Sequence, residues 1–244
     1  MPAALPSSPY RGQVWRLVEA QHIVSTTRLV DSLDEQRVLE EILESTKPPV
    51  PPDCAHLDYL LAAPFRYGCY PSDSRFRRRG RTPGVYYASE RPETAVAETV
   101  WYRLRFYQES PSTPLPTNAA EYTAFAVRVA TASALDLNAT PLSKRNADWT
   151  HPDDYSACLD LADQARGDGI GIIRYASARH PDAWPNVALL TYAAFADAKP
   201  RLRRSIRIHL RRDSAQVFAE LPRSRYEFFL GETRLRWMPR SVTN

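Results

Sequence analysis

Prolines divide this chain of 244 residues into short segments. Its 21 prolines outnumber its eight glycines, and each proline removes a backbone donor and resists the interior of a helix. The run PPVPP at 48–52 ends any helix that precedes it, whereas Pro92 suits the first position of a helix. Further breaks are expected at 110–116 and at Pro152. The run at 48–52 is a stiff connector, too short to link two domains.

The best-marked helix lies just before that run. Ser32 is a suitable N-cap, and Glu35, three residues later, completes a capping box. The helix is predicted to end at Lys47, and its apolar stripe consists of Leu39, Ile42 and Leu43.

Other helices and strands follow from punctuation and periodicity. We expect an apolar segment at 57–67, a helix at 93–106 with Ala95, Val96, Thr99 and Val100 toward the core, and a helix that begins after Pro152 and ends at Gly167. Predicted strands cover 13–19, 85–88, 122–137 (one strand or two), 170–175, 187–192, 205–210, 216–221 and 226–237, the last with a Gly-Glu turn inside it. The simplest architecture is α+β, with one domain over residues 13–240 behind an extended or disordered segment 1–12.

Composition excludes several classes of protein. No apolar stretch approaches the ~18 residues of a membrane span, and the N-terminus lacks the layout of a signal peptide, so we expect a cytoplasmic protein without a membrane partner. Cys54, Cys69 and Cys158 form no CxxC pair, and the five histidines are scattered. Neither a disulfide framework nor a metal site is therefore predicted.

Arginine is concentrated in two places. A polar loop contains Arg75, Arg77, Arg78, Arg79 and Arg81. Residues 199–244 contain 12 basic residues and four acidic ones, whereas residues 1–198 carry a net charge of −4. The loop can bind a phosphate or carboxylate through its guanidinium groups. The favoured interpretation of both clusters, taken alone, is a solvated surface, and the alternative is a nucleic-acid-binding patch.

Several short motifs occur in an order that resembles the RES domain. They read SRFR at 74–77, GVYYASE at 84–90, PETAVAE at 92–98, and GIIRYASAR at 171–179 followed by NVALL at 186–190. The segments VWRLVE and STTRLVDSLDEQRVLEEILESTKPP resemble the longer members of that family, the type that includes the ParT toxins. The resemblance covers about residues 13–230.

This resemblance implies a fold, a function and partners. RES proteins resemble ADP-ribosyltransferases in fold, with a mixed, mostly antiparallel central sheet and flanking helices. They are toxins of bacterial type II toxin–antitoxin pairs that consume NAD, either by phosphorolysis or by transferring ADP-ribose to a protein. The implied partners are a cognate antitoxin of the Xre/ParS type, a second copy in a homodimer, and a protein acceptor where ADP-ribose is transferred. NAD is the consumed substrate, and no metal is implied.

The resemblance also assigns site residues. The catalytic arginine, tyrosine and glutamate of the family match Arg75, Tyr87 and Glu98 of this chain. Ser177 and Arg16, together with Arg75 and Tyr87, are the implied NAD-binding residues. Arg77 is an alternative for Arg75, and Tyr86 for Tyr87.

Each implied residue suits the chemistry. Cleavage of the nicotinamide–ribose bond develops positive charge on the sugar, which Glu98 would stabilise. Arg75 would hold the diphosphate or an incoming phosphate, Tyr87 would stack on nicotinamide, and Ser177 would offer a hydroxyl near the nucleotide.

Two questions stay open at the level of sequence. The acceptor can be phosphate, water or a protein side chain, because all three need the same Arg, Tyr and Glu. The alternative function is a basic nucleic-acid-binding protein without catalytic activity. Aromatic residues do not interleave with the loop arginines in a recognisable nucleic-acid-binding pattern, so direct binding of nucleic acid is not expected.

Overall fold

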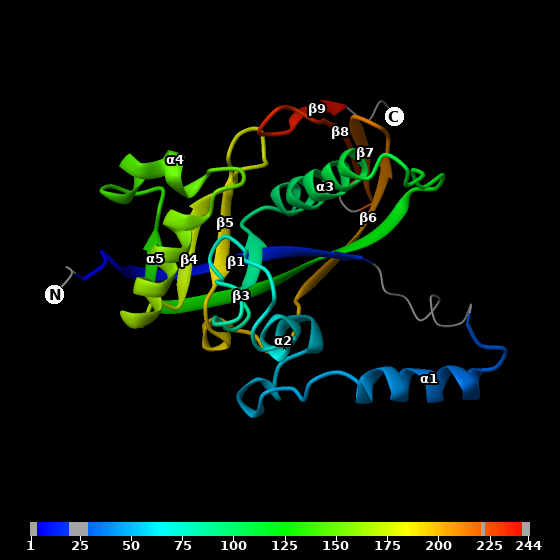
Figure 1. Ribbon diagram of the computed structural model, residues 1–244, viewed down its shortest axis with the longest axis horizontal. Helices are drawn as coiled ribbons and strands as arrows, with labels where there is room; N and C mark the ends of the chain where they lie inside the picture. Colours follow the sequence, from blue (N-terminus) through cyan, green and yellow to red (C-terminus); the bar gives the residue numbers. More distant parts are fainter. Residues whose placement is uncertain (1–3, 20–28, 221–222, 241–244) are drawn as a thin grey trace.

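The computed structural model describes residues 4–19, 29–220 and 223–240. These residues form one nine-stranded mixed sheet, in the order β1-β2-β5-β4-β3-β6-β7-β8-β9, with an additional pairing between β1 and β3 (Figure 1). The strands are β1 Ser8–Glu19, β2 Tyr86–Ser89, β3 Ala120–Asp136, β4 Ile172–Ala176, β5 Pro185–Leu189, β6 Leu202–Leu210, β7 Ser214–Glu220, β8 Arg223–Phe229 and β9 Arg236–Arg240.

The described residues also form five α-helices and three short 3-10 turns. The helices are α1 Leu33–Ser45, α2 Tyr59–Arg66, α3 Pro92–Glu109, α4 Asn146–Trp149 and α5 Ser156–Gly167, and the turns are η2 Pro52–Cys54, η3 Leu142–Arg145 and η4 Tyr192–Ala194.

Strand β3 is the spine of the sheet. It pairs with β1 in antiparallel fashion along most of its length, with β6 at 120–126, and with β4 in parallel at 134–136. Strand β1 also meets β2, through the pair Trp15 and Ser89. The strands β1, β2, β5, β4 and β3 therefore close on themselves, and β6 to β9 continue the sheet from β3 as an antiparallel extension.

Alternate residues of the central strands face two different cores, as the period of a strand requires. Trp15 and Ala124 belong to a core beneath α3, whereas Val14 and Phe125 belong to a core on the opposite face, beside α2. A third core, around Trp149, packs α4 and α5 against β4 and β5. Figure 1 shows α3 and α2 on opposite sides of the central strands.

The α+β architecture with a mostly antiparallel, mixed sheet is confirmed, and most boundaries lie within a few residues of the prediction. Strand β1 begins at Ser8, inside the segment 1–12 that we expected to be extended or disordered. Segment 122–137 is one strand rather than two. The strand predicted at 187–192 ends at Leu189 because Tyr192 opens the turn η4. The last residue of the strand predicted at 216–221 lies outside the described residues.

Helix α1 confirms its cap but not its expected end. The Ser32 side chain accepts from the Glu35 N–H (3.2 Å), while the Glu35 carboxylate accepts from the Asp31 N–H (2.8 Å). The helix ends at Ser45, two residues before Lys47. Two members of its apolar stripe are exposed, since Ile42 is 54% and Leu43 43% accessible. Periodicity correctly predicted the helix, but it does not tell which face is covered.

Candidate active site

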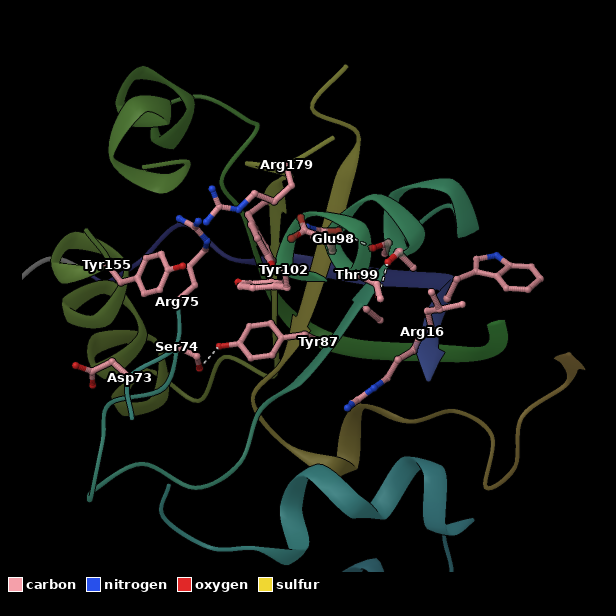
Figure 2. A pocket seen from close by; sticks show the side chains of 17 residues that line it. Arg16, Asp73, Ser74, Arg75, Tyr87, Glu98, Thr99, Tyr102, Tyr155 and Arg179 are labelled. Atoms are coloured by element: carbon pink, nitrogen blue, oxygen red, sulfur yellow. Dashed lines mark hydrogen bonds between the residues drawn. The ribbon is translucent and has the colours of Figure 1, made fainter. Parts of the chain in front are cut away.

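A cavity of about 390 Å³ lies beside the paired residues Trp15 of β1 and Ser89 of β2, and α3 forms one of its walls (Figure 2). The loop before β2, the segment before α5, and β4 and β5 close it from the other sides. Its lining residues are Trp15, Arg16, Leu17, Asp73, Ser74, Arg75, Tyr87, Ala88, Ser89, Ala95, Glu98, Thr99, Tyr102, Tyr155, Tyr175, Arg179 and Asn186. Four of the five predicted site residues, Arg16, Arg75, Tyr87 and Glu98, are thus brought together from segments far apart in the chain.

Glu98, on the second turn of α3, is half-buried and points into the cavity (Figure 2). Its Oε1 accepts two hydrogen bonds, from Ser177 Oγ (2.6 Å) and from Asn186 Nδ2 (2.7 Å). Among the described residues, no hydrogen bond to its Oε2 is recorded. One oxygen of the carboxylate is therefore fixed by the protein, and the other is available to a ligand.

Ser177 lies behind Glu98 rather than in the cavity wall. It is fully buried, and its Oγ accepts from the backbone N–H groups of Arg179 (3.1 Å) and His180 (2.9 Å). Because both acceptor positions are used, the single hydroxyl proton is directed to Glu98. The family resemblance predicts that Ser177 contacts the nucleotide. In the structure, Ser177 instead orients the Glu98 carboxylate.

Asn186 is oriented in the same way from β5. Its Oδ1 accepts from Ser89 Oγ (2.6 Å), which leaves its amide to donate to Glu98. Both residues are buried, at 2% exposure each. Strands β2 and β5 thus support the catalytic candidate on α3 through one chain of hydrogen bonds.

Arg75 is buried at 9% exposure in the loop before β2. Its guanidinium donates to the carbonyl oxygens of Trp149 (2.7 Å) and His151 (3.0 Å) and lies over the ring of Tyr155, at 4.7 Å from its centre. Burial acts to lower the pKa of Arg75, but the neighbouring Tyr175, Cys158, Tyr155 and Glu98, in that order of effect, raise that pKa above its ordinary value. The group is held in place by neutral carbonyls, so its positive charge is not neutralised by a direct ion pair among the described residues.

Arg179 is a second buried guanidinium in the wall, and it is not among the site residues that the motifs predict. It is 3% exposed, donates through Nη2 to the Pro152 carbonyl (2.6 Å), and lies over the ring of Trp101 at 4.5 Å. Its Nη1 is buried, and among the described residues it has no hydrogen-bond partner.

Arg16 enters from β1 on another side of the cavity, as Figure 2 shows. Its guanidinium lies over the ring of Tyr86, at 4.8 Å from the centre, and burial lowers its pKa from the ordinary value. Within the described part of the chain, its buried Nη1 also lacks a partner. A buried donor without a partner is rare and usually marks a ligand site or a trapped water.

The two neighbouring tyrosines of β2 have different surroundings. Tyr86 is fully buried among apolar side chains, whereas Tyr87 is half-buried and lines the cavity. The Tyr87 hydroxyl accepts from the Phe76 N–H (3.0 Å) and shares a hydrogen bond with Ser74 Oγ (2.8 Å). Tyr87 therefore anchors the loop that carries Arg75, and its ring remains available to a planar ligand.

The other loop arginines do not reach the cavity. Arg77 lies over the ring of Tyr70, at 3.8 Å. Arg78 pairs with Asp160 (2.8 Å) and Asp163 (2.9 Å), and Arg81 pairs with Asp163 as well (2.6 Å). The loop is thus fastened to α5 by ion pairs, and the geometry favours Arg75 over Arg77 as the cavity residue.

Two arginines of β6 make contacts outside the cavity. Arg207 is exposed and pairs with Glu121 and Glu220, while Arg204 lies over the ring of Trp15, at 4.5 Å. Both arginines thus contact other residues of the sheet, and neither lines the cavity.

Sequence reasoning missed the aromatic lining and two polar residues of the site. Tyr102, Tyr155 and Tyr175 line the cavity with Glu98, and burial raises the pKa of Tyr102 and of Tyr175. Arg179 and Asn186 were inside the motifs that suggested the family, but nothing in their spacing distinguishes them from structural residues. Tyr102 lies four residues after Glu98 on α3, one turn along the same face, which is the one available signal.

The site combines features that suit a particular class of ligand. One carboxylate oxygen is available, three arginines lack a carboxylate partner in direct contact within the described residues, and several tyrosine rings line the wall. Such a wall fits a molecule with a phosphate group, a planar ring and a carbon that becomes positively charged. The described residues contain no cluster of three or more metal-binding side chains and no helix long and apolar enough to cross a membrane.

Comparison with known proteins identifies a family. Curated proteins give no match. Among solved structures, a chain of the crystal structure of the M. tuberculosis MbcT–MbcA toxin–antitoxin complex is similar, with 13% identity, coverage of 83% of this chain and 87% of that chain, and a TM-score of 0.47. The RES domain model matches residues 50–211, about two thirds of the chain, and this range includes Arg75, Tyr87 and Glu98. On that match, the chain belongs to the RES domain family.

Proposed function

We propose that this protein consumes NAD by cleaving the bond between nicotinamide and ribose. The observation that carries the proposal is Glu98, whose Oε1 is fixed by Ser177 and Asn186 while its Oε2 is left for a ligand in a cavity walled by arginines. Members of the RES family process NAD, which agrees with this geometry.

Glu98 would act on the sugar. As the bond to nicotinamide lengthens, its electrons leave with the neutral nicotinamide, and positive charge develops on the ribose. A carboxylate beside the ribose stabilises that charge and accepts a hydrogen bond from the 2′-hydroxyl through its free Oε2. The hydrogen bonds from Ser177 and Asn186 keep the carboxylate oriented throughout, so that no rearrangement is needed in the transition state.

Other residues would bind the dinucleotide. Arg75 and Arg16 supply positive charge toward phosphate groups, and the Tyr87 ring offers a face for the nicotinamide. Ser177 acts through Glu98 as a positioning residue, because its hydroxyl is buried behind the carboxylate. This arrangement resembles that of an ADP-ribosyltransferase in its chemistry.

The acceptor of ADP-ribose remains one of three. Phosphate would give ADP-ribose-1″-phosphate with loss of the acceptor's proton, water would give free ADP-ribose, and a protein side chain would give a modified protein. All three need the same leaving-group step, so the product is the discriminating observation.

The biological role we propose is that of a toxin in a bacterial type II toxin–antitoxin pair, acting in the cytoplasm. NAD consumption would arrest the cell, and an antitoxin of the Xre/ParS type would restrain it. The family membership and the toxin–antitoxin character of MbcT support this role. A homodimer of one domain over residues 13–240 is the assembly that would meet the antitoxin.

Incubation of the purified protein with NAD, with and without phosphate, tests the activity. We expect release of nicotinamide, and mass spectrometry then separates the three products by mass. Absence of release with phosphate, with water and with cell extract as acceptor would overturn the proposal. Salt-sensitive binding to DNA or RNA without any release would instead favour the nucleic-acid-binding alternative.

A further inference from the structure

Burial of the Arg179 guanidinium in this position costs free energy, because the charge loses its contact with water. It is 3% exposed, and its Nη1 has no partner among the described residues. A buried guanidinium without a carboxylate is destabilising, and proteins usually pair such a group or place it where a ligand supplies the negative charge. Among the described residues, the Arg179 guanidinium donates one hydrogen bond, to the neutral carbonyl of Pro152.

The backbone and side chain of Arg179 are nevertheless held from several sides. Its N–H donates to Ser177 Oγ (3.1 Å), its carbonyl accepts from the Leu235 N–H (3.0 Å), and its guanidinium lies over Trp101. A side chain that is fixed in this way, and still lacks a partner for Nη1, is preorganised for a ligand rather than misplaced.

Arg75 brings a second positive charge to the same place. It donates to the carbonyls of Trp149 and His151, and Arg179 donates to that of Pro152, so both guanidinium groups converge on residues 149–152. Figure 2 shows the two groups directed toward the same part of the cavity, on the side away from Arg16. Two like charges near each other in a buried wall repel, and an anion between them removes the repulsion.

We propose that Arg75 and Arg179 form one oxyanion subsite, which binds the diphosphate of the dinucleotide. The identity of the dinucleotide rests on the proposed function, whereas the chemistry of the subsite, a phosphate-type anion held by two fork-shaped donors, rests on the geometry alone. Arg179 is therefore a substrate-binding residue that neither the family motifs nor the sequence spacing assigned.

The subsite also depends on strands outside the family match. Leu235 lies just before β9, and Trp237 of β9 packs against His180, with ring centres 5.5 Å apart. The RES domain match ends at residue 211. The hairpin of β8 and β9 thus supports the segment 177–180 that carries Arg179 on one side of the cavity and Ser177 behind Glu98.

Titration calorimetry with ADP, inorganic phosphate and adenosine tests the subsite without catalysis. We expect the wild type to bind ADP and Arg179→Ala to lose about tenfold to a hundredfold of that affinity, the range for hydrogen bonds to charged groups. Adenosine, which lacks the phosphates, should bind equally to both proteins. Arg81→Ala is the matched control, because Arg81 pairs with Asp163 outside the cavity.

A conservative variant guards against a folding defect. Arg179→Lys keeps the charge but not the fork, so its ADP affinity should fall between those of the wild type and of Arg179→Ala. Circular dichroism and thermal unfolding show whether each variant is folded. If inorganic phosphate binds more tightly than ADP, the subsite is one for free phosphate, and the proposal that it binds the diphosphate is overturned.

The outcomes for the subsite and for the proposed function differ. Three results would overturn the subsite. The first is an unchanged ADP affinity in folded Arg179→Ala or Arg179→Lys, and the second is an equal loss of affinity for adenosine. The third is a wild type that binds neither ADP nor phosphate. NAD cleavage with an unchanged KM in Arg179→Ala overturns the subsite and leaves the proposed function intact. Arg179-dependent binding of ADP by a protein that never cleaves NAD supports the subsite and overturns the function.

Discussion

The arginines of the cavity and those of the surrounding loop differ in their partners. Arg75 and Arg179 are buried and donate to neutral carbonyls. Arg78 and Arg81, only a few residues from Arg75, are paired with carboxylates of α5. Local density of arginine in the sequence therefore says little about function. What separates a binding arginine from a structural one is whether the fold has already supplied its negative charge.

Among the variants that test this comparison, the largest effect should come from removing the buried arginine Arg75. Arg75→Ala should lower kcat/KM for NAD cleavage by about a hundredfold, because it removes charge-assisted hydrogen bonds to a phosphate group. Arg81→Ala should change kcat/KM by less than about twofold, since an exposed ion pair contributes little. Steady-state nicotinamide release measures both. Equal losses in the two variants would mean that the loop acts as a whole and that the comparison is wrong.

Arg179 and His180 are adjacent in the chain and both buried, but they differ in charge. Arginine keeps its charge at any ordinary pH, whereas His180 can release its proton. His180 is fully buried, its Nδ1 accepts from the Asp182 N–H (3.1 Å), and its ring stacks on Trp184 at 4.3 Å. Burial lowers the pKa of His180 to about 4. The histidine thus enters the fold neutral, while the arginine needs an anion.

This difference predicts a loss of stability in acid. The unfolded chain binds a proton at His180 with a pKa of about 6.5, and the folded chain does so only near 4. The contribution of His180 is therefore complete above pH 6.5 and falls as the pH approaches 4, with about 2 kcal/mol of unfolding free energy lost by pH 5. Urea unfolding of the wild type and of His180→Phe at pH 7 and 5 measures it. A drop of the same size in the variant would assign the effect to other groups.

Ser177 should affect turnover more than binding. Ser177→Ala removes one of the two hydrogen bonds to Glu98 Oε1, and we expect kcat to fall about tenfold with little change in KM. Nicotinamide release over a range of NAD concentrations separates the two constants. A rise in KM with an unchanged kcat would restore Ser177 to direct contact with the nucleotide, as the sequence suggested.

The smallest expected effect is a difference in stability between variants of the two tyrosines of β2, Tyr86 and Tyr87. Tyr87→Phe loses the hydrogen bonds to Ser74 and Phe76, and we expect about 1 kcal/mol of stability to be lost. Tyr86→Phe should be neutral or stabilising, because the buried Tyr86 hydroxyl has no partner among the described residues. Thermal unfolding of the pair gives the difference. A larger loss for Tyr86→Phe would contradict the assignment of Tyr87 as the anchor of the loop.

Local signals in the sequence predicted local structure well. The cap at Ser32, the first position of α3 at Pro92 and the turn after Gly167 each depend on neighbouring residues, and the structure places helix boundaries beside all three. The exposure of α1 could not be predicted in this way, since it depends on which surface the rest of the chain offers to that helix.

The site could be predicted only in part, for the same reason. Glu98, Arg75, Tyr87 and Arg16 come from an ordered set of motifs, and the structure brings them to one cavity. The roles of Ser177, Asn186 and Arg179 depend on contacts between residues about 80 positions apart or on a contact with Leu235. No periodicity or spacing reports such contacts.

Glu98 is the residue on which the account depends most, and one measurement tests it directly. Nicotinamide release from NAD should be compared among the wild type, Glu98→Gln and Glu109→Gln, the last an exposed glutamate at the far end of α3 that pairs with Arg105. We predict that Glu98→Gln lowers the rate by a factor of about 10² to 10³ while remaining folded, as loss of transition-state charge stabilisation requires. Glu109→Gln should match the wild type. Equal release by the wild type and Glu98→Gln would contradict the central claim.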